Sequence, residues 1–148
     1  MVKIDVDKVA ARQGSTYPEP FRSLSLTRTK KRLGDAAGLT DFGVNLTRLP
    51  PGEWSSQRHW HVHEDEFVYV LEGELTMMTD AGEQILRAGE CAGFKKNSGD
   101  GHHFINRSGA VAVYLEVGSR APNEEAHYPD VDMHMAGGKF LHKDRTPY

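Results

Sequence analysis

The sequence contains little cysteine and no long apolar run. Cys91 is the only cysteine in 148 residues, so the chain cannot form an internal disulfide or a thiol-based zinc site, as is typical of a reducing compartment. No window approaches the roughly 18 consecutive apolar residues of a membrane span. Residues 1–7 are charged and lack the apolar stretch of a secretory signal. We therefore expect a cytoplasmic protein that does not enter a membrane.

An excess of positive charge is also missing. The chain has 18 Lys and Arg against 21 Asp and Glu, a formal net charge of -3. This balance does not attract nucleic acid or anionic lipid. One basic run, residues 28–32, offers a contact for a phosphate, although a solvated surface is the commoner role of such a run. We expect a small-molecule partner, and neither nucleic acid nor membrane.

The length suits one domain, and the pattern between residues 42 and 117 is all-β. Short apolar runs alternate there with turn residues, and no stretch has a helical period. The spacing predicts a sandwich or barrel. The expected strands are Phe42–Leu49, Trp54–His63, Glu66–Glu72, Glu74–Thr79, Glu83–Arg87, Cys91–Phe94, His102–Asn106 and Val111–Val117.

Several of these segments carry residues that we expect inside the barrel. The run 67–71 is apolar at every position, which predicts a central strand covered on both faces. Tyr69 of this run, with Phe104 and Tyr114, is expected to line or fill the barrel. Cys91 is expected to be a small buried residue rather than a nucleophile.

The ends of the chain are polar and interrupted by proline. We divide the sequence into an N-terminal arm, 1–41, a barrel, 42–118, and a C-terminal arm, 119–148. Arms that cannot build their own core pack on the barrel or on a second subunit, so we expect a homodimer. A second metal group in the C-terminal arm is conceivable, but the proline and acidic residues around it favour a solvated tail. Its members would be His127, Asp130, Asp132 and His134.

Clustered histidines are the strongest chemical signal. Five of the eight histidines fall in the segments 59–63 and 102–103. Residues i and i+2 of a strand project from one face, so His59 and His61 present two imidazoles side by side. Two imidazoles near a carboxylate form a ligand set for a first-row transition metal. A third histidine from another strand would complete it.

Two motifs around these histidines resemble those of the cupin superfamily. The first is Gly52, six residues, His59, His61, then Glu66 and Gly73, and the second is Gly89 followed by His102-x-x-x-Asn106. Together they span roughly residues 42–117. The sequence departs from the family pattern at Lys95, where the family has proline, and in longer spacers after Gly52 and before His102.

The resemblance implies a double-stranded β-helix, a small jelly-roll barrel that holds one divalent metal near its mouth. By position, the implied ligands are His59, His61, Glu66 and His102. Glu66 has the opposite parity to His61, so the strand must turn or bulge between them, and Asp65 is a rival ligand. Likewise, His103 is a rival of His102. Iron, manganese, nickel, cobalt and zinc all accept such ligands, and no further cofactor is predicted.

The resemblance extends to small single-domain cupins of the sugar-phosphate-isomerase-like branch. It implies a metal-dependent isomerase, epimerase or lyase acting on a sugar, hydroxy acid or keto acid. Candidates for proton transfer are His63, His103 and Tyr69. Two alternatives stay open: an Fe(II)-dependent dioxygenase, and a non-catalytic cupin that binds or senses a ligand.

Overall fold

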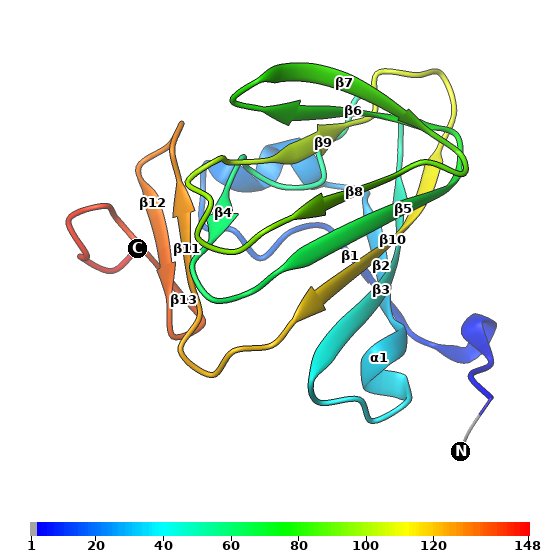
Figure 1. The fold of residues 1–148 in the computed structure, drawn as a ribbon, viewed down its shortest axis with the longest axis horizontal. Coiled ribbons are helices and arrows are strands. Elements are labelled where there is room, and N and C mark those ends of the chain that lie inside the picture. Colours follow the sequence, from blue (N-terminus) through cyan, green and yellow to red (C-terminus); the bar gives the residue numbers. More distant parts are fainter. Residues whose placement is uncertain (1–2) are drawn as a thin grey trace.

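A computed structural model describes residues 3–148, so residues 1 and 2 of the expected N-terminal arm lie outside the described residues. Antiparallel strands dominate the fold (Figure 1). The helices are η1 (Val6–Lys8), η2 (Phe21–Ser25) and α1 (Leu33–Ala36). The strands are β1 (Ala11–Gln13), β2 (Thr29–Arg32), β3 (Phe42–Leu49), β4 (Trp60–His61), β5 (Glu66–Glu72), β6 (Glu74–Thr79), β7 (Gly82–Arg87), β8 (Cys91–Phe94), β9 (His103–Ile105), β10 (Ala112–Ser119), β11 (Glu125–Tyr128), β12 (Met133–Ala136) and β13 (Lys139–Leu141). Within this part of the chain, no helix is long and apolar enough to cross a membrane.

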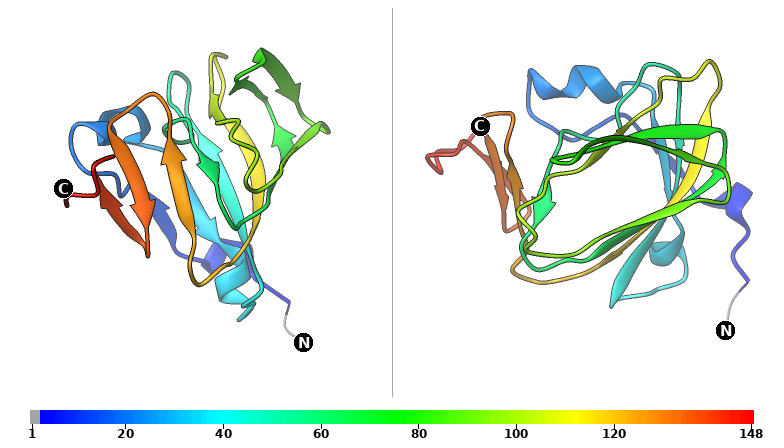
Figure 2. Two further views of the ribbon diagram at one scale, coloured as in Figure 1. Left: turned by 60° about the vertical axis from the view of Figure 1, so that its left-hand side comes forward. Right: turned by 45° about the horizontal axis from the view of Figure 1, so that its top comes forward.

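The strands form three sheets. The first has the order β1-β2-β3-β10-β5-β8, the second β7-β6-β9 and the third β13-β12-β11-β4. The first two sheets face each other, and the third lies at one side (Figure 2). Their facing side chains make one core: Leu49, Val68, Val70, Leu75, Met77, Leu86, Phe104, Ala112 and Tyr114. The expected all-β architecture of two facing sheets is therefore confirmed, as is the interior position of Phe104 and Tyr114.

Alternation predicted most of the barrel strands. The observed β3, β5, β6 and β8 have the expected bounds, and β7, β9 and β10 differ at their ends. The prediction for residues 54–63 is wrong, because only Trp60–His61 forms a strand there. Trp54 and His59 instead make isolated antiparallel bridges, to Ile105 and His102 respectively.

The prediction of a strand covered on both faces is wrong for β5. Val68 and Val70 are buried, but Phe67, Tyr69 and Leu71 on the other face are 38–41% exposed. Within residues 3–148, no element covers this outer face. Tyr69 therefore does not line the barrel. Cys91, which is paired with Tyr69 in the sheet, is exposed as well, so its expected burial is also wrong.

Both arms add strands to the barrel. The N-terminal β2 pairs with β3, and the C-terminal β11 pairs with β4. The third sheet covers a second small core of Tyr17, Ala126, Tyr128 and Met133. A solvated C-terminal tail is therefore a wrong prediction: burial of alternate residues along β11 supplies the apolar contact that holds the arm.

Candidate metal centre

A β-bridge joins the two histidine segments. The backbone N–H of His59 donates to the carbonyl of His102 at 3.1 Å, and the N–H of His102 donates to the carbonyl of His59 at 2.8 Å. Phe94 of β8 stacks on the His102 imidazole with ring centroids 3.6 Å apart. Backbone pairing and ring stacking together hold both imidazoles before any ligand binds.

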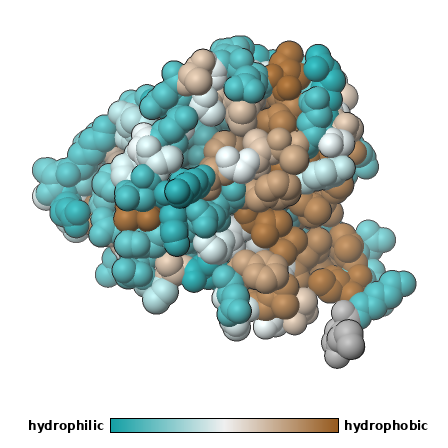
Figure 3. All heavy atoms as spheres, viewed as in Figure 1, coloured by the Kyte–Doolittle hydropathy of each residue, from teal (hydrophilic) through white to brown (hydrophobic). Residues whose placement is uncertain are grey.

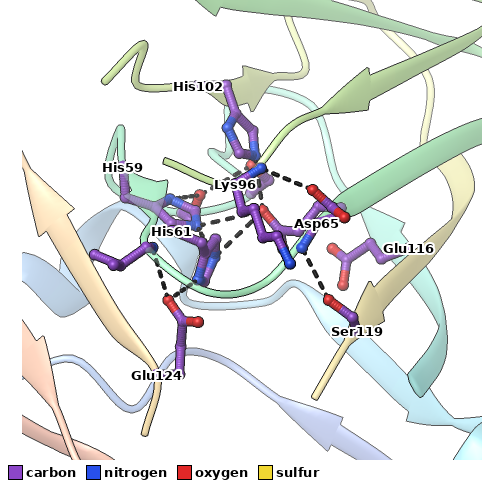
Figure 4. Close-up of polar contacts among 12 residues, drawn as sticks. His59, His61, Asp65, Lys96, His102, Glu116, Ser119 and Glu124 are labelled. Atoms are coloured by element: carbon purple, nitrogen blue, oxygen red, sulfur yellow. Dashed lines mark hydrogen bonds and ion pairs between the residues drawn. The ribbon is translucent and has the colours of Figure 1, made fainter. Parts of the chain in front are cut away.

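Three imidazole nitrogens surround one carboxylate oxygen. The Nε2 atoms of His102, His61 and His59 lie 2.9, 3.3 and 3.8 Å from Glu66 Oε2. His59 Nε2 and His61 Nε2 are 3.1 Å apart. The imidazoles of His59, His61 and His102 point toward one another (Figure 4). Adjacent ligands of an ion with bonds near 2.1 Å lie about 3.0–3.4 Å apart, and the His59–His61 and His61–Glu66 separations match this spacing. The ligand atoms of His59, His61 and Glu66 all lie within 4.8 Å of one another, so these three suit a shared cation, and His102 approaches them through Glu66.

Hydrogen bonding supports the same interpretation. Glu66 Oε2 is buried and has no hydrogen-bond partner of good geometry, despite its close imidazoles. Buried polar atoms are normally paired, so an orphaned oxygen among imidazole nitrogens needs an explanation. The missing hydrogen bond is explained if the lone pairs of Glu66 Oε2 and of the imidazole nitrogens are all directed at one bound cation. The donor set of imidazole nitrogens and one carboxylate fits a first-row transition metal.

Neighbouring acceptors fix two of the imidazoles. His59 Nδ1 lies 2.8 Å from the carbonyl of Gln57, and His61 Nδ1 lies 3.2 Å from Glu124 Oε1. In a neutral imidazole whose Nδ1 donates to one of these oxygens, Nε2 keeps its lone pair for a metal. Glu124 also accepts the backbone N–H groups of Val62 and His63, both at 3.0 Å. Sequence reasoning missed Glu124, which precedes β11 and forms no local motif with the histidines.

The buried carboxylates control the charge of this cluster. Burial lowers the pKa of His59 to about 3. Burial acts in the same direction on His61, but the carboxylates of Glu66 and Glu124 outweigh it and raise the pKa of His61 to about 9. Burial disfavours the charged form of Glu66, yet His102 and His61 hold the pKa of Glu66 well below its ordinary value. A carboxylate kept ionised among imidazoles is suited to a cation.

Of the rival carboxylates, Glu66 faces the histidines. The expected turn is present, since β4 ends at His61 and β5 begins at Glu66. Asp65 is exposed and ties the chain elsewhere: its Oδ1 accepts the backbone N–H of Lys96 at 2.8 Å, and its own N–H donates to Ser119 Oγ at 2.9 Å (Figure 4). Asp65 therefore holds the turn that aims Glu66 inward.

The structure does not bring the three predicted proton-transfer residues to the cluster. His103 packs against Trp54 with ring centroids 4.5 Å apart, and burial lowers its pKa. The Nε2 of His63 lies 3.5 Å from Asn123. Tyr69 points from the outer face of β5. Strand alternation explains the positions of His103 and Tyr69. Each is the immediate neighbour in its strand of a residue that faces inward, so its own side chain points the other way.

A cavity of about 270 Å³ adjoins the cluster and is lined by His59, His61, Glu66 and His102. Its other walls come largely from segments outside the motifs. They include Thr16, Tyr17, Arg28, Lys30, Glu116 and Tyr128. Tyr128 stacks on His59 with ring centroids 5.5 Å apart. Sequence reasoning assigned none of these residues to the site, because their contacts with it are long-range.

The second metal group that the sequence made conceivable, His127, Asp130, Asp132 and His134, does not assemble. Asp130 pairs with Arg58, and Asp132 pairs with His142. A different trio, Glu125, His127 and His134, has ligand atoms within 4.8 Å of one another. Arg145 approaches Glu125 to 3.6 Å.

Comparisons with known proteins agree with this architecture. Residues 45–118 match the model of the cupin domain family. A structure from Silicibacter pomeroyi, named as a sugar phosphate isomerase of a cupin superfamily, is 44% identical to this chain. Its TM-score is 0.94, and the match covers 99% of this chain and 96% of that one. A candidate sugar phosphate isomerase from Acidithiobacillus ferrooxidans is 30% identical, with a TM-score of 0.72 over 77% and 74% of the two chains.

A more distant structure shares the fold alone. The polyketide cyclase RemF from Streptomyces resistomycificus is 22% identical, with a TM-score of 0.64 over 80% of this chain and 79% of that one. The search of curated proteins found no match. The domain match covers half of the residues and the Silicibacter likeness covers nearly all of them, so this chain belongs to the cupin superfamily.

Proposed function

We propose that this cupin is a metal-dependent enzyme of the isomerase, epimerase or lyase type. Its substrate would be a small oxygen-rich molecule such as a sugar, hydroxy acid or keto acid. The observation that carries the proposal is the convergence of three imidazole nitrogens on Glu66 Oε2 beside a polar cavity. The name of the 44% identical relative, a sugar phosphate isomerase, supports the same reaction class.

We assign one divalent iron, manganese, nickel, cobalt or zinc ion to His59, His61, Glu66 and His102. When bound, such an ion supplies Lewis acidity that polarises a substrate carbonyl and favours loss of a proton from the adjacent carbon. The protein's share is to hold the nitrogen lone pairs in place. Glu124 does this for His61 by accepting its Nδ1–H.

Glu116 is the best-placed group to move a proton. It lines the cavity, its side chain is 20% exposed, and it is not one of the converging ligands. Lys30 Nζ lies 2.6 Å from Glu116 Oε2 and fixes its orientation. A carboxylate oxygen in this position would accept the substrate proton and return it to a neighbouring carbon. Glu116 thus takes the role that sequence analysis gave to His63, His103 and Tyr69.

The first experiment is elemental analysis of the untagged protein and of the variant His61→Ala. We expect near-stoichiometric transition metal in the wild type and its loss in the variant. His142→Ala is the matched control, because His142 pairs with Asp132 outside the cluster. Full metal occupancy in His61→Ala would refute the assigned ligands.

Turnover then separates the reaction classes. An isomerase, epimerase or lyase should act without oxygen and with redox-inert Zn(II). Strict oxygen dependence would instead indicate a dioxygenase. Tight metal-dependent ligand binding without any turnover would indicate a sensing cupin.

We also propose that the chain forms a homodimer through the outer face of β5. Phe67, Tyr69 and Leu71 are exposed there, and apolar residues gather over this part of the surface (Figure 3). Contiguous exposed apolar patches mark association surfaces. Light scattering after size exclusion should give twice the chain mass for the wild type and one chain mass for Tyr69→Lys. Ile85→Lys, on the other sheet, should stay dimeric, and a monomeric wild type would overturn the proposal.

A further inference from the structure

The basic run of the N-terminal arm reaches the cavity. Arg28, directly before β2, and Lys30, within it, line the same cavity as His59, His61 and Glu66. Strand alternation sends Lys31 to the opposite face, where its Nζ donates to the carbonyl of Val6 at 2.7 Å. Within the basic run, Arg28 and Lys30 therefore line the cavity, and Lys31 does not.

Carboxylates do not neutralise all of this positive charge. Lys30 pairs with Glu116 at 2.6 Å, and Glu66, the other carboxylate in the lining, faces the imidazoles. The Arg28 guanidinium binds only backbone carbonyls, those of Gly14 at 2.8 Å and of Ser55. In residues 3–148, no carboxylate lies within ion-pair distance of the Arg28 guanidinium, although Glu53 Oε2 accepts the backbone N–H of Arg28 at 2.7 Å.

One hydrogen-bond donor of the Arg28 guanidinium has no acceptor. Arg28 Nε is buried and has no hydrogen-bond partner. An unsatisfied buried donor costs free energy, and the cost is greater on a charged group. A ligand oxygen that accepted this hydrogen bond would remove the cost. A negatively charged oxygen would also balance the charge, and a guanidinium suits the paired oxygens of carboxylate and phosphate.

We propose that Arg28, assisted by Lys30, forms a subsite for an oxyanion group of the substrate. The subsite takes a phosphate ester or a carboxylate, whose shared chemistry is a charged group with several oxygens. This inference rests on the proposed function in one respect: it assumes that the substrate bound at Arg28 is the one that meets the metal cluster. The substrate then has two ends, a hydroxyl or carbonyl end at the cluster and an anionic end at Arg28.

Calorimetric titration with inorganic phosphate and with acetate tests the subsite directly. Each anion is added to the metal-loaded protein, to the same protein after treatment with EDTA, and to His61→Ala. The arginine is tested with Arg28→Gln and Arg28→Lys, and the lysine with Lys30→Gln. Lys31→Gln is the matched control, since it removes the same charge from the same strand on the other face. Melting curves show whether each variant is folded.

We expect at least one of the two anions to bind, and its affinity to fall at least tenfold in Arg28→Gln and measurably in Lys30→Gln. Lys31→Gln should match the wild type. Preference for phosphate or for acetate identifies the anionic group. Because Arg28 holds two backbone carbonyls, Arg28→Gln has a folding risk. If it does not fold, Lys30→Gln and Arg28→Lys decide the question.

Wild-type affinity in folded Arg28→Gln, or no binding of either anion, would overturn the proposal. Loss of binding after EDTA treatment would overturn it as well, because the anion would then sit on the metal. Binding that survives both EDTA and His61→Ala supports the subsite even if the metal assignment fails. The two proposals can therefore fail separately.

Discussion

Replacing Glu124 by glutamine tests how the C-terminal arm supports the proposed metal site. Glu124 accepts three groups, His61 Nδ1 at 3.2 Å and the N–H groups of Val62 and His63 at 3.0 Å. Glutamine has one acceptor oxygen and no charge, so it cannot serve all three. Loss of such an outer carboxylate weakens metal binding about 10–100-fold, equivalent to about 1.4–2.7 kcal/mol. We expect this loss in Glu124→Gln.

The assay is a competition titration of Zn(II) or Co(II) against a chelator, at a temperature where the variant is folded. Lost hydrogen bonds to a charged acceptor should also lower the free energy of unfolding by about 1–3 kcal/mol, measured in urea without metal. Glu83→Gln is the control, because it removes a carboxylate that pairs with Arg107 at the surface. If metal affinity in Glu124→Gln stays within about twofold of wild type while stability falls, Glu124 is only a structural residue and the reasoning is wrong.

Two further predictions concern the fold around the site. The hydrogen bond from Arg58 lowers the pKa of Asp130. The ionised Asp130 carboxylate therefore stabilises the native state at pH values above the ordinary aspartate pKa of about 3.9. This contribution disappears as the pH falls through the pKa that Asp130 has in the native state. Since the Asp130 side chain is 56% exposed, Asp130→Asn should lower the free energy of unfolding by at most about 1 kcal/mol at pH 7. In acid, the melting temperature of the variant should converge with that of the wild type. A difference in melting temperature that does not change with pH would contradict this. Gly73 has φ +74°, and a Cβ there would lie 3.0 Å from the Val111 carbonyl, whereas at Gly52, φ +81°, nothing lies within 4 Å. Both alanine variants have a backbone cost of about 1–2 kcal/mol, and Gly73→Ala should lose more in urea denaturation; equal losses would show that the close approach has no effect.

The parts of the fold predicted from sequence are those fixed by local pattern. The strands Phe42–Leu49 and Glu66–Glu72 have the expected bounds because alternation and flanking turn residues specify them within a short window. Tyr69 could have been placed correctly by the same rule. Once Glu66 faces inward, Val68 and Val70 follow it, and Tyr69 must face outward. The error came from interpreting an all-apolar strand as one buried on both sides.

The missed parts of the candidate site depend on long-range contacts. Glu124 meets His61 across 63 positions of sequence, and Lys30 meets Glu116 through the sheet. No spacing rule connects such pairs. The basic run 28–32 was visible, but only the alternation of β2 against β3 decides which of its side chains enter the barrel. Local patterns therefore identified the converging histidines, and tertiary structure was needed for the residues around them.

The contrast between locally encoded histidines and residues brought in from the arms suggests where substrate specificity arises in this cupin. The matched segment, residues 45–118, contains all four proposed ligands and Glu116. The groups that surround them, Arg28, Lys30, Glu124 and Tyr128, come from the two arms. The arms join the rest of the fold by strand pairing: β2, directly after Arg28, pairs with β3, and β11, directly after Glu124, pairs with β4. On the two proposals made above, the barrel ligands set the chemistry that a bound metal supplies, whereas Arg28 and Lys30 of the N-terminal arm select the charged end of the substrate held beside it. Exchanging residues 11–32 with those of another cupin should therefore change substrate charge preference while leaving metal content intact.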